Sequence, residues 1–291
     1  MAFEGFDTHL IDVGDARLFV RSGGKGPPLL LLHGYPQTHM IWHDVAPRLA
    51  DRFHLVIPDL RGYGRSTGPQ PDAEGHLYSK RTMAADMIAL MSALGHQRFC
   101  VAGHDRGGRV AYRLALDHPR RVDRLCILDI VPTSEMWGRM NHAGALRSYH
   151  WSFLAQPPPM PEHMIGRDPD FYLMHLLRRW AGNVNALLAH ALADYQESFR
   201  KPSVIAATCA DYRAGAGIDA EHDHADRLAQ KRIGCPTLVI WGRQYLNTQS
   251  PLATWRIWAS DVREVALDCG HFIAEEQPEA CAGALADFLS G

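Results

Sequence analysis

A short glycine-flanked segment, Gly103-His104-Asp105-Arg106-Gly107, carries the side chain with the clearest capacity for chemistry. The segment directly follows an apolar run, Phe99–Ala102, and opens a helical pattern over Arg106–Leu116. Small residues two positions before and after its centre let the chain turn sharply from strand to helix, and such a turn exposes the central side chain. A carboxylate there is a poor nucleophile toward esters but a competent one for alkylation at carbon. We therefore interpret Asp105 as a nucleophile; the alternative is a capping Asp in a glycine-rich turn.

Polar motifs also follow three other predicted strands. They are His33-Gly34-Tyr35-Pro36, Asp59-Leu60-Arg61-Gly62-Tyr63-Gly64-Arg65-Ser66 and Gly270-His271-Phe272. The first motif lies where an oxyanion hole is needed, so we expect the backbone N–H groups of Tyr35 and Arg106 to form one. The last motif lies where a general base is needed, and His271 is the candidate.

A third residue is needed to orient that base. The loop after Thr237–Trp241 begins Gly242-Arg243-Gln244-Tyr245-Leu246-Asn247 and offers no carboxylate. Asp129 stands at the end of an otherwise apolar strand, where a carboxylate is costly unless it is paired. We therefore assign Asp129 to His271, and the chain order Asp105, Asp129, His271 agrees with nucleophile, acid and base. The alternative is a capping role for Asp129 with the acid elsewhere.

Two arginines follow the nucleophile. Arg109 lies three residues after Arg106, so on one helix both guanidinium groups can converge near the first turn. Two guanidinium groups beside a carboxylate nucleophile suggest a substrate that carries its own carboxylate. The alternative is that both arginines simply pair with nearby Asp residues.

The elements that must position these residues alternate between strands and helices. Short, continuous apolar runs predict strands buried on both faces, as in a parallel sheet: Leu29–Leu32, Leu55–Ile57, Phe99–Ala102, Leu125–Leu128, Thr237–Trp241 and, more weakly, Glu264–Leu267. Helical patterns cover Thr82–Leu94, which stops at Gly95, Arg106–Leu116 and Pro278–Leu289. Two alternating segments, His9–Val13 and Arg17–Arg21, flank Gly14-Asp15 and predict an N-terminal hairpin. The fold class is therefore α/β, with a mostly parallel, doubly wound sheet.

The alternation stops between about Pro132 and Ile233. This stretch has no convincing strand run, is rich in His, Trp, Tyr and Met, and contains Pro157-Pro158-Pro159-Met160-Pro161. We expect a helical cap over residues 134–231, inserted into a core of residues 1–133 and 232–291. The cap should cover the carboxyl ends of the strands, where open α/β sheets bind ligands.

Composition limits the function classes. The chain has 291 residues, 46% hydrophobic and 21% charged, so it can bury a substantial core and is not expected to be disordered. With 30 basic and 32 acidic residues, nucleic acid is not an expected partner. We expect no transmembrane helix, no secretory signal and reduced, buried cysteines, as in a cytoplasmic protein. Neither a metal-ligand cluster nor a dinucleotide fingerprint is present, so we expect no cofactor.

Together, these motifs resemble the dehalogenase and epoxide-hydrolase branch of the α/β-hydrolases over nearly the whole chain. Arg106 departs from many of those relatives, which carry Trp after the nucleophile. Two segments of the inserted region, His150-Trp151 and Asp211-Tyr212-Arg213-Ala214-Gly215, together with the Asp105 segment and Arg109, are similar to the fluoroacetate dehalogenases specifically. The resemblance implies an α/β-hydrolase fold without a cofactor, and it makes a homodimer plausible.

The resemblance also implies roles for single residues. His150, Trp151 and Tyr212 would donate hydrogen bonds to the departing fluoride, and Arg106 and Arg109 would bind the substrate carboxylate. Trp180 would wall the pocket, although residues 178–185 depart from the family pattern. The expected activity is hydrolysis of fluoroacetate, a small-molecule haloacid, to glycolate and fluoride through an ester on Asp105. An epoxide hydrolase with the same nucleophile and base, or a ligand-binding homologue without turnover, is the alternative.

Overall fold

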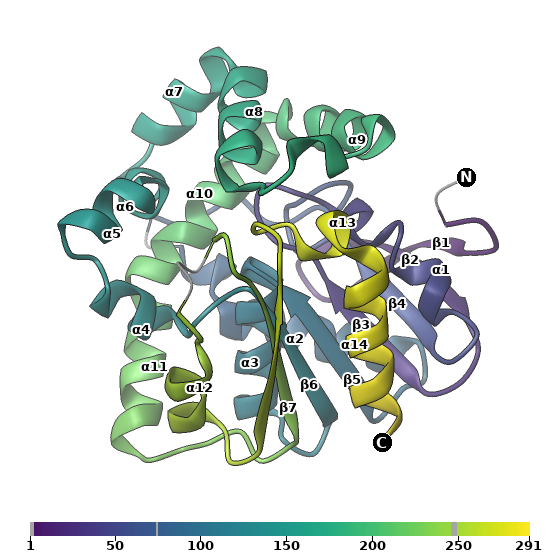
Figure 1. Ribbon diagram of the computed structural model, residues 1–291. Helices are drawn as coiled ribbons and strands as arrows, with labels where there is room; N and C mark the ends of the chain where they lie inside the picture. Colours follow the sequence, from purple (N-terminus) through teal and green to yellow (C-terminus); the bar gives the residue numbers. More distant parts are fainter. Residues whose placement is uncertain (1–2, 74, 246–248) are drawn as a thin grey trace.

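A twisted, mostly parallel sheet forms the centre of the computed structural model, which describes residues 3–73, 75–245 and 249–291 (Figure 1). Over these residues the sheet has eight strands in the order β1-β2-β4-β3-β5-β6-β7-β8. Their bounds are β1 Asp7–Asp12, β2 Arg17–Gly24, β3 Pro28–Leu32, β4 His54–Pro58, β5 Phe99–His104, β6 Val122–Leu128, β7 Thr237–Gly242 and β8 Val262–Leu267. The pairs β1–β2 and β2–β4 are antiparallel, and the remaining pairs are parallel.

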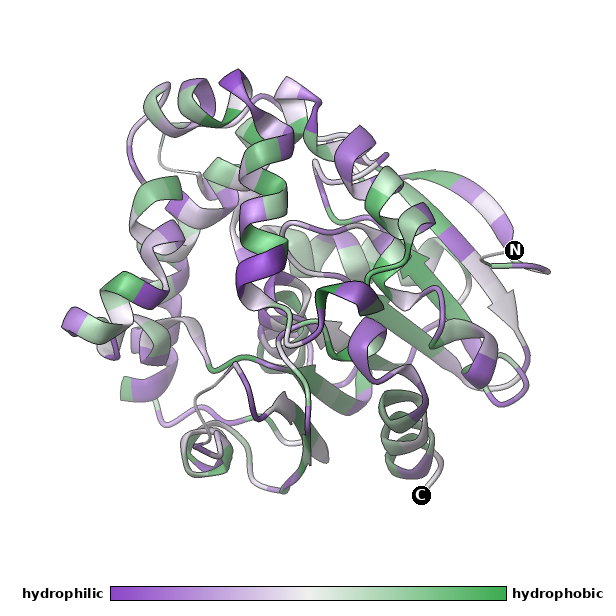
Figure 2. Cartoon of the chain, turned by 45° about the horizontal axis from the view of Figure 1, so that its top comes forward, coloured by the Kyte–Doolittle hydropathy of each residue, from purple (hydrophilic) through white to green (hydrophobic). Residues whose placement is uncertain are grey.

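The apolar runs form the predicted strands because both faces of the sheet are covered. All six residues of β5 are buried, and Leu29–Leu32 of β3 are fully buried. Figure 2 shows the central strands as hydrophobic over most of their length, whereas the outer helices alternate between hydrophobic and hydrophilic residues. The predicted parallel sheet and N-terminal hairpin are therefore confirmed, and the hairpin lies at one edge of the sheet.

The strand register brings the carboxyl ends of the central strands to one level. Leu32 of β3 pairs with Gly103 of β5, His104 pairs with Leu128 of β6, and Leu128 pairs with Ile240 of β7. The loops that follow these strands therefore emerge side by side at one edge of the sheet, and this edge receives the polar motifs described above.

Helices cover both faces of the sheet. They are α1 Ala46–Leu49, α2 Lys80–Ala93, α3 Arg106–Asp117, α12 Leu252–Trp258, α13 Ile273–Glu276 and α14 Pro278–Ser290. Helix α2 packs beside α3, and α1 packs beside α14, which crosses in front of the sheet in Figure 1. The three predicted helices are present; α2 begins two residues earlier than expected, because Ser79 caps it by accepting a hydrogen bond from the Thr82 N–H.

The residues between β6 and β7, all of them described, contain helices and no strand. The helices are α4 Thr133–Gly138, α5 His142–Arg147, α6 Tyr149–Leu154, α7 Met160–Arg167, α8 Pro169–Trp180, α9 Ala189–Phe199, α10 Pro202–Ala216 and α11 Ile218–Leu228. In Figure 1 helices α7, α8 and α9 stand above the sheet. We propose residues 134–231 as the cap and use that name below for these residues.

Two global expectations can be compared with the described residues. None of the helices in the described ranges combines the length and apolar character needed to cross a bilayer. All six cysteines are free thiols, and all are buried except Cys235, which is half-buried.

Candidate active site

A sharp turn between β5 and α3 carries Asp105, a buried residue that lines a cavity. Asp105 has φ 46° and ψ −114°, a backbone conformation that a residue with a side chain rarely adopts. The two flanking glycines make the turn possible. A Cβ on Gly103 would lie 2.4 Å from the carbonyl oxygen of Gly107, and a Cβ on Gly107 would lie 2.3 Å from that of His33. The glycines allow β5, α3 and the loop after β3 to meet at Asp105.

The loop after β3 contacts Asp105 from one side. The backbone N–H of Tyr35 donates a hydrogen bond to Oδ1 of Asp105 at 3.0 Å. Gly34 allows this approach, since a Cβ there would lie 2.4 Å from the Cβ of Asp105. Arg106, whose N–H is the second expected oxyanion donor, is the first residue of α3.

His271 lies on the other side of Asp105. Its Nε2 is 3.7 Å from Oδ2 of Asp105, and Nε2 has no hydrogen-bond partner among the described residues. Its Nδ1 is 2.7 Å from Oδ2 of Asp129, while the N–H of Gly242 donates to the other Asp129 oxygen at 2.9 Å. The structure therefore brings the three expected residues together. The loop after β7 contains no carboxylate from Arg243 to Tyr245, and residues 246–248 lie outside the described ranges.

The carboxylates and His271 shift one another's pKa. Burial alone would raise the pKa of Asp105, but the adjacent His271 and the charge of Arg106 outweigh burial and hold that pKa well below its usual range. Burial likewise opposes protonation of His271, yet the neighbouring carboxylates of Asp105 and Asp129 raise its pKa to about 9. At neutral pH Asp105 is therefore ionised and lies beside the imidazolium of His271.

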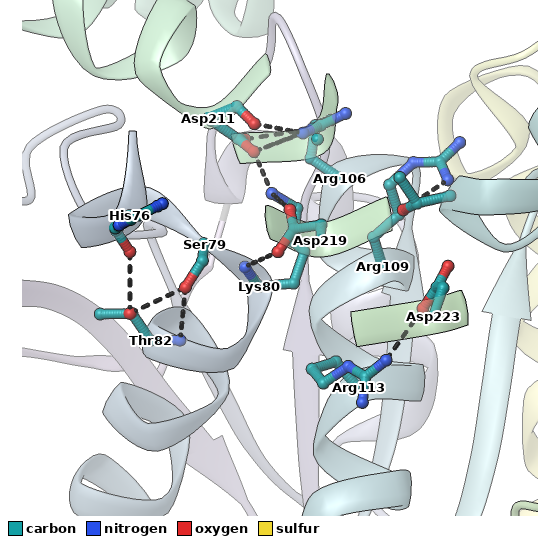
Figure 3. A network of polar contacts seen from close by, with 12 residues as sticks. His76, Ser79, Lys80, Thr82, Arg106, Arg109, Arg113, Asp211, Asp219 and Asp223 are labelled. Carbon is teal, nitrogen blue, oxygen red and sulfur yellow. Dashed lines mark hydrogen bonds and ion pairs between the residues drawn. The ribbon is translucent and has the colours of Figure 1, made fainter. Parts of the chain in front are cut away.

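The two arginines occupy different environments. Arg109 lines the cavity beside Asp105, and its Nη1 donates hydrogen bonds to the Val131 carbonyl at 2.9 Å and to Thr133 Oγ1 at 3.3 Å. Arg106 is fully buried and directed at Asp211, as Figure 3 shows. The alternative interpretation of the arginines, that they pair with nearby Asp residues, is therefore observed for Arg106. Both guanidinium groups still approach the Trp151 ring, at 5.4 Å for Arg106 and 4.5 Å for Arg109.

The aromatic residues expected around a halide lie together under the cap. The ring centroid of Tyr212 on α10 is 5.7 Å from those of His150 and Trp151 on α6. Trp180, the last residue of α8, lies 4.6 Å from His150. Nδ1 of His150 and Nε1 of Trp180 are buried without a hydrogen-bond partner in the described residues. Burial lowers the pKa of His150 to about 3 and raises that of Tyr212, so both side chains are neutral at neutral pH.

A cavity of about 470 Å³ opens onto Asp105. Of the expected site residues, it is lined by Asp105, Arg109, Asp129, Trp151 and His271. The others, namely Tyr35, Arg106, His150, Trp180 and Tyr212, are buried residues that are not part of this lining.

Other lining residues were not singled out from the sequence. The Tyr245 ring lies 4.2 Å from the His271 ring. In the sequence, only the position of Tyr245 in the loop after a predicted strand could have indicated that it belongs to the site. At the outer end, Met136, Arg139 and Arg147 line the cavity, and nothing in their local pattern indicated that place. Within the described part of the chain, no group of three or more His, Cys, Asp or Glu side chains could hold a metal ion.

Comparison with known proteins gives this arrangement a family. The family model described as the alpha/beta hydrolase fold matches residues 27–278. A fluoroacetate dehalogenase from Burkholderia sp is 42% identical over 99% of this chain and 95% of its own. A soluble epoxide hydrolase from Corynebacterium sp. (strain C12) is 33% identical over 93% of each chain. A solved protein from Nostoc sp PCC 7120, provisionally described as an alpha/beta hydrolase, is 48% identical, with a TM-score of 0.96 over 99% of each chain. The chain therefore belongs to the α/β-hydrolase family and, within it, to the fluoroacetate dehalogenase family.

Proposed function

We propose that this chain is a haloacetate dehalogenase that hydrolyses fluoroacetate to glycolate and fluoride. The observation that carries the proposal is the placement of an ionised Asp105, the His271–Asp129 pair and Arg109 around one cavity. The similarity to the Burkholderia fluoroacetate dehalogenase, over nearly the full length of both chains, supports it. The reaction requires a small-molecule haloacid and water.

In the first step Asp105 attacks the carbon that bears the halogen. An oxygen of Asp105 forms a bond to that carbon as the carbon–halogen bond breaks, and the electron pair leaves with the halide. The low pKa of Asp105 supports this step, because the carboxylate is ionised and needs no base to activate it. An ester of Asp105 with the glycolyl carbon results.

In the second step water hydrolyses the ester. Esterification removes the negative charge of Asp105, one of the two carboxylates that raise the pKa of His271 to about 9. The pKa of His271 therefore falls when the ester forms, and the imidazolium releases its proton to solvent. The neutral imidazole can then take a proton from the attacking water. Asp129 holds Nδ1, so Nε2 is the nitrogen that accepts it. The hydroxide adds to the carboxyl carbon of Asp105, and the N–H groups of Tyr35 and Arg106 stabilise the resulting oxyanion. The bond from that carbon to the glycolate oxygen then breaks, and the proton on His271 passes to this oxygen as glycolate leaves.

The polar groups around the carbon decide which substrate fits. Arg109 offers its guanidinium to a carboxylate from within the cavity lining, and Arg106 retains a buried Nη1 without a partner. His150, Trp151 and Tyr212 offer an imidazole, an indole and a phenol as donors to the departing halide. Fluoride is a poor leaving group, so several preorganised donors in a buried pocket are what its displacement requires.

Epoxide hydrolysis is the second candidate, because one specific feature favours it. An epoxide hydrolase uses the same Asp and His but needs acidic donors, usually tyrosines, over the epoxide oxygen. The Tyr245 and Tyr212 phenols are neutral, since burial raises the pKa of both, and Tyr245 lies against His271. Arg109 in the cavity lining disfavours this candidate, since a neutral epoxide gives a buried cation no partner.

Halide release separates the two candidates. Purified protein is incubated with fluoro-, chloro- and bromoacetate and, in parallel, with neutral epoxides, and free halide and diol are measured. We expect halide and glycolate from the haloacetates, and neither product from an Asp105→Ala variant. Diol formation without halide release would assign the chain to epoxide hydrolysis. A folded protein that releases neither product would refute both candidates.

A further inference from the structure

A buried row of alternating charges links two core helices to the cap behind Arg106 (Figure 3). Arg106 of α3 and Lys80 of α2 both contact the carboxylate of Asp211 on α10. The Lys80 ammonium also lies 3.6 Å from Asp219 on α11, and the Lys80 backbone N–H donates to the same carboxylate at 2.8 Å. The row therefore reads Arg106, Asp211, Lys80, Asp219.

Asp211 fixes the orientation of the Arg106 guanidinium. Nε of Arg106 donates to both carboxylate oxygens, at 3.2 and 3.1 Å, and Nη2 donates to the Asp211 carbonyl at 2.8 Å. The guanidinium carbon also lies 4.1 Å from the centroid of the Tyr212 ring. Nη1 is the nitrogen that remains buried without a partner among the described residues. One edge of the guanidinium is thus held, and Nη1 on the other edge keeps its hydrogen-bonding capacity unused.

The core in turn fixes Asp211. The Tyr63 hydroxyl donates to Oδ2 of Asp211 at 2.6 Å, and the Lys80 ammonium binds Oδ1. The side chains of Lys80, Asp211 and Tyr63 are each no more than 1% exposed. Burial opposes ionisation of Asp211, but the charges of Arg106 and Lys80 lower its pKa to about 2. A lysine ammonium is rarely buried so completely, and a purely structural site could be filled by an apolar side chain at lower cost.

The row as a whole carries no net charge, because Asp219 balances Lys80 as Asp211 balances Arg106. Asp219 is not a hydrogen-bond partner of Arg106 in the described residues. Lys80 therefore acts on Arg106 through the position of the Asp211 carboxylate. A guanidinium that is held in one orientation and keeps a free N–H is what a substrate carboxylate requires.

We propose that Lys80, acting through Asp211, is a positioning residue that orients the Arg106 guanidinium for the carboxylate of an α-halo acid. This inference rests on the proposed function, since it assigns Arg106 to that carboxylate. Because Asp211 and Asp219 belong to the cap while Lys80 and Arg106 belong to the core, carboxylate binding depends on the docked cap.

The test compares Lys80→Met with two controls. Lys80→Arg keeps the charge. Arg113→Met breaks two other ion pairs between core and cap, from α3 to Asp223 and Asp226 of α11, without touching Asp211. We measure KM and kcat for bromoacetate, the Kd of glycolate by calorimetry, and the melting temperature. Lys80→Met should raise KM and Kd about tenfold with kcat within about twofold, because Arg106 binds the carboxylate equally in ground and transition states.

The controls separate positioning from folding. Lys80→Arg should restore most of the KM and Kd, and Arg113→Met should lower the melting temperature while leaving both constants unchanged. Tyr63→Phe, which removes only one donor to Asp211, should raise Kd by a few fold and serves as the test if Lys80→Met does not fold. Unchanged KM and Kd in Lys80→Met would overturn the inference. If Lys80→Met does not fold, an unchanged Kd in Tyr63→Phe would overturn it instead. A rise of KM and Kd in Arg113→Met as large as in Lys80→Met would also overturn it.

The measurement of glycolate binding does not depend on turnover. If the wild-type protein releases no halide but the Kd of glycolate changes in the variants as stated, the proposed function fails and the positioning role of Lys80 stands. A wild-type protein that binds no glycolate would refute the positioning role.

Discussion

Replacing His271 with Asn should separate the two chemical steps of the proposed reaction. Nε2 of His271 lies 3.7 Å from Asp105, within reach of a water that attacks the ester but without a hydrogen bond to the carboxylate. The His271→Asn enzyme should therefore displace halide once and then stop as an ester on Asp105, because the base for hydrolysis is missing.

The expected magnitudes differ for the two steps. Loss of a positioned general base slows the step it serves by about 10²- to 10⁴-fold. Displacement needs only an ionised Asp105. If the loss of His271 returned the pKa of Asp105 to 3.8, about one carboxyl in a thousand would be protonated at pH 7. The Tyr35 N–H would still hold Oδ1 at 3.0 Å. We therefore expect displacement to slow by less than about tenfold and turnover by at least about a hundredfold.

The assay is a single-turnover measurement with bromoacetate. Bromide should appear as one equivalent per active site, and mass spectrometry should find a carboxymethyl increment on the peptide that contains Asp105. An Asp105→Ala enzyme should show neither signal. If folded His271→Asn enzyme binds substrate but releases no bromide, the two-step reasoning is wrong. An increment on Asp129 instead would require the nucleophile and the acid to be reassigned.

Three further predictions concern two residues of the candidate active site and one buried carboxyl group. Arg109→Leu removes a guanidinium from the cavity lining, so kcat/KM for haloacetates should fall by about two decades or more. If the variant keeps the wild-type kcat/KM, Arg109 does not bind the substrate carboxylate. Trp151→Phe keeps the bulk but loses the indole N–H, so fluoroacetate turnover should fall more than bromoacetate turnover, whereas equal losses would mean that Trp151 only packs. Glu275 is buried against Tyr195 and Gln37, and burial raises its pKa from 4.5 to about 8. Its stabilising effect is complete below pH 4.5 and is lost as the pH rises through about 8. Between pH 5 and 9 the free energy of unfolding should therefore fall by about 4 kcal/mol more in wild type than in Glu275→Gln.

The sequence alone determined the parts of this protein that depend on local pattern. Continuous apolar runs predicted the parallel strands, because a strand buried on both faces has no polar alternation. The glycines around Asp105 predicted the turn, because only glycine fits at Gly103 and Gly107. Once the strand ends are known to meet at one edge of the sheet, the motifs after them identify Asp105, Asp129 and His271 as neighbours. The family follows from the same motifs in that chain order.

Only the tertiary structure decided which groups surround those residues. Arg106 and Asp211 are separated by more than a hundred positions, and so are Lys80 and Asp211. No periodicity links such partners, because their contact depends on how the cap docks on the core. The same holds for Tyr245, which reaches His271 through the path of the loop after β7. The spacing of Arg106 and Arg109 correctly indicated one helical turn, but docking of the cap directed one guanidinium to a carboxylate and left the other in the lining of the cavity.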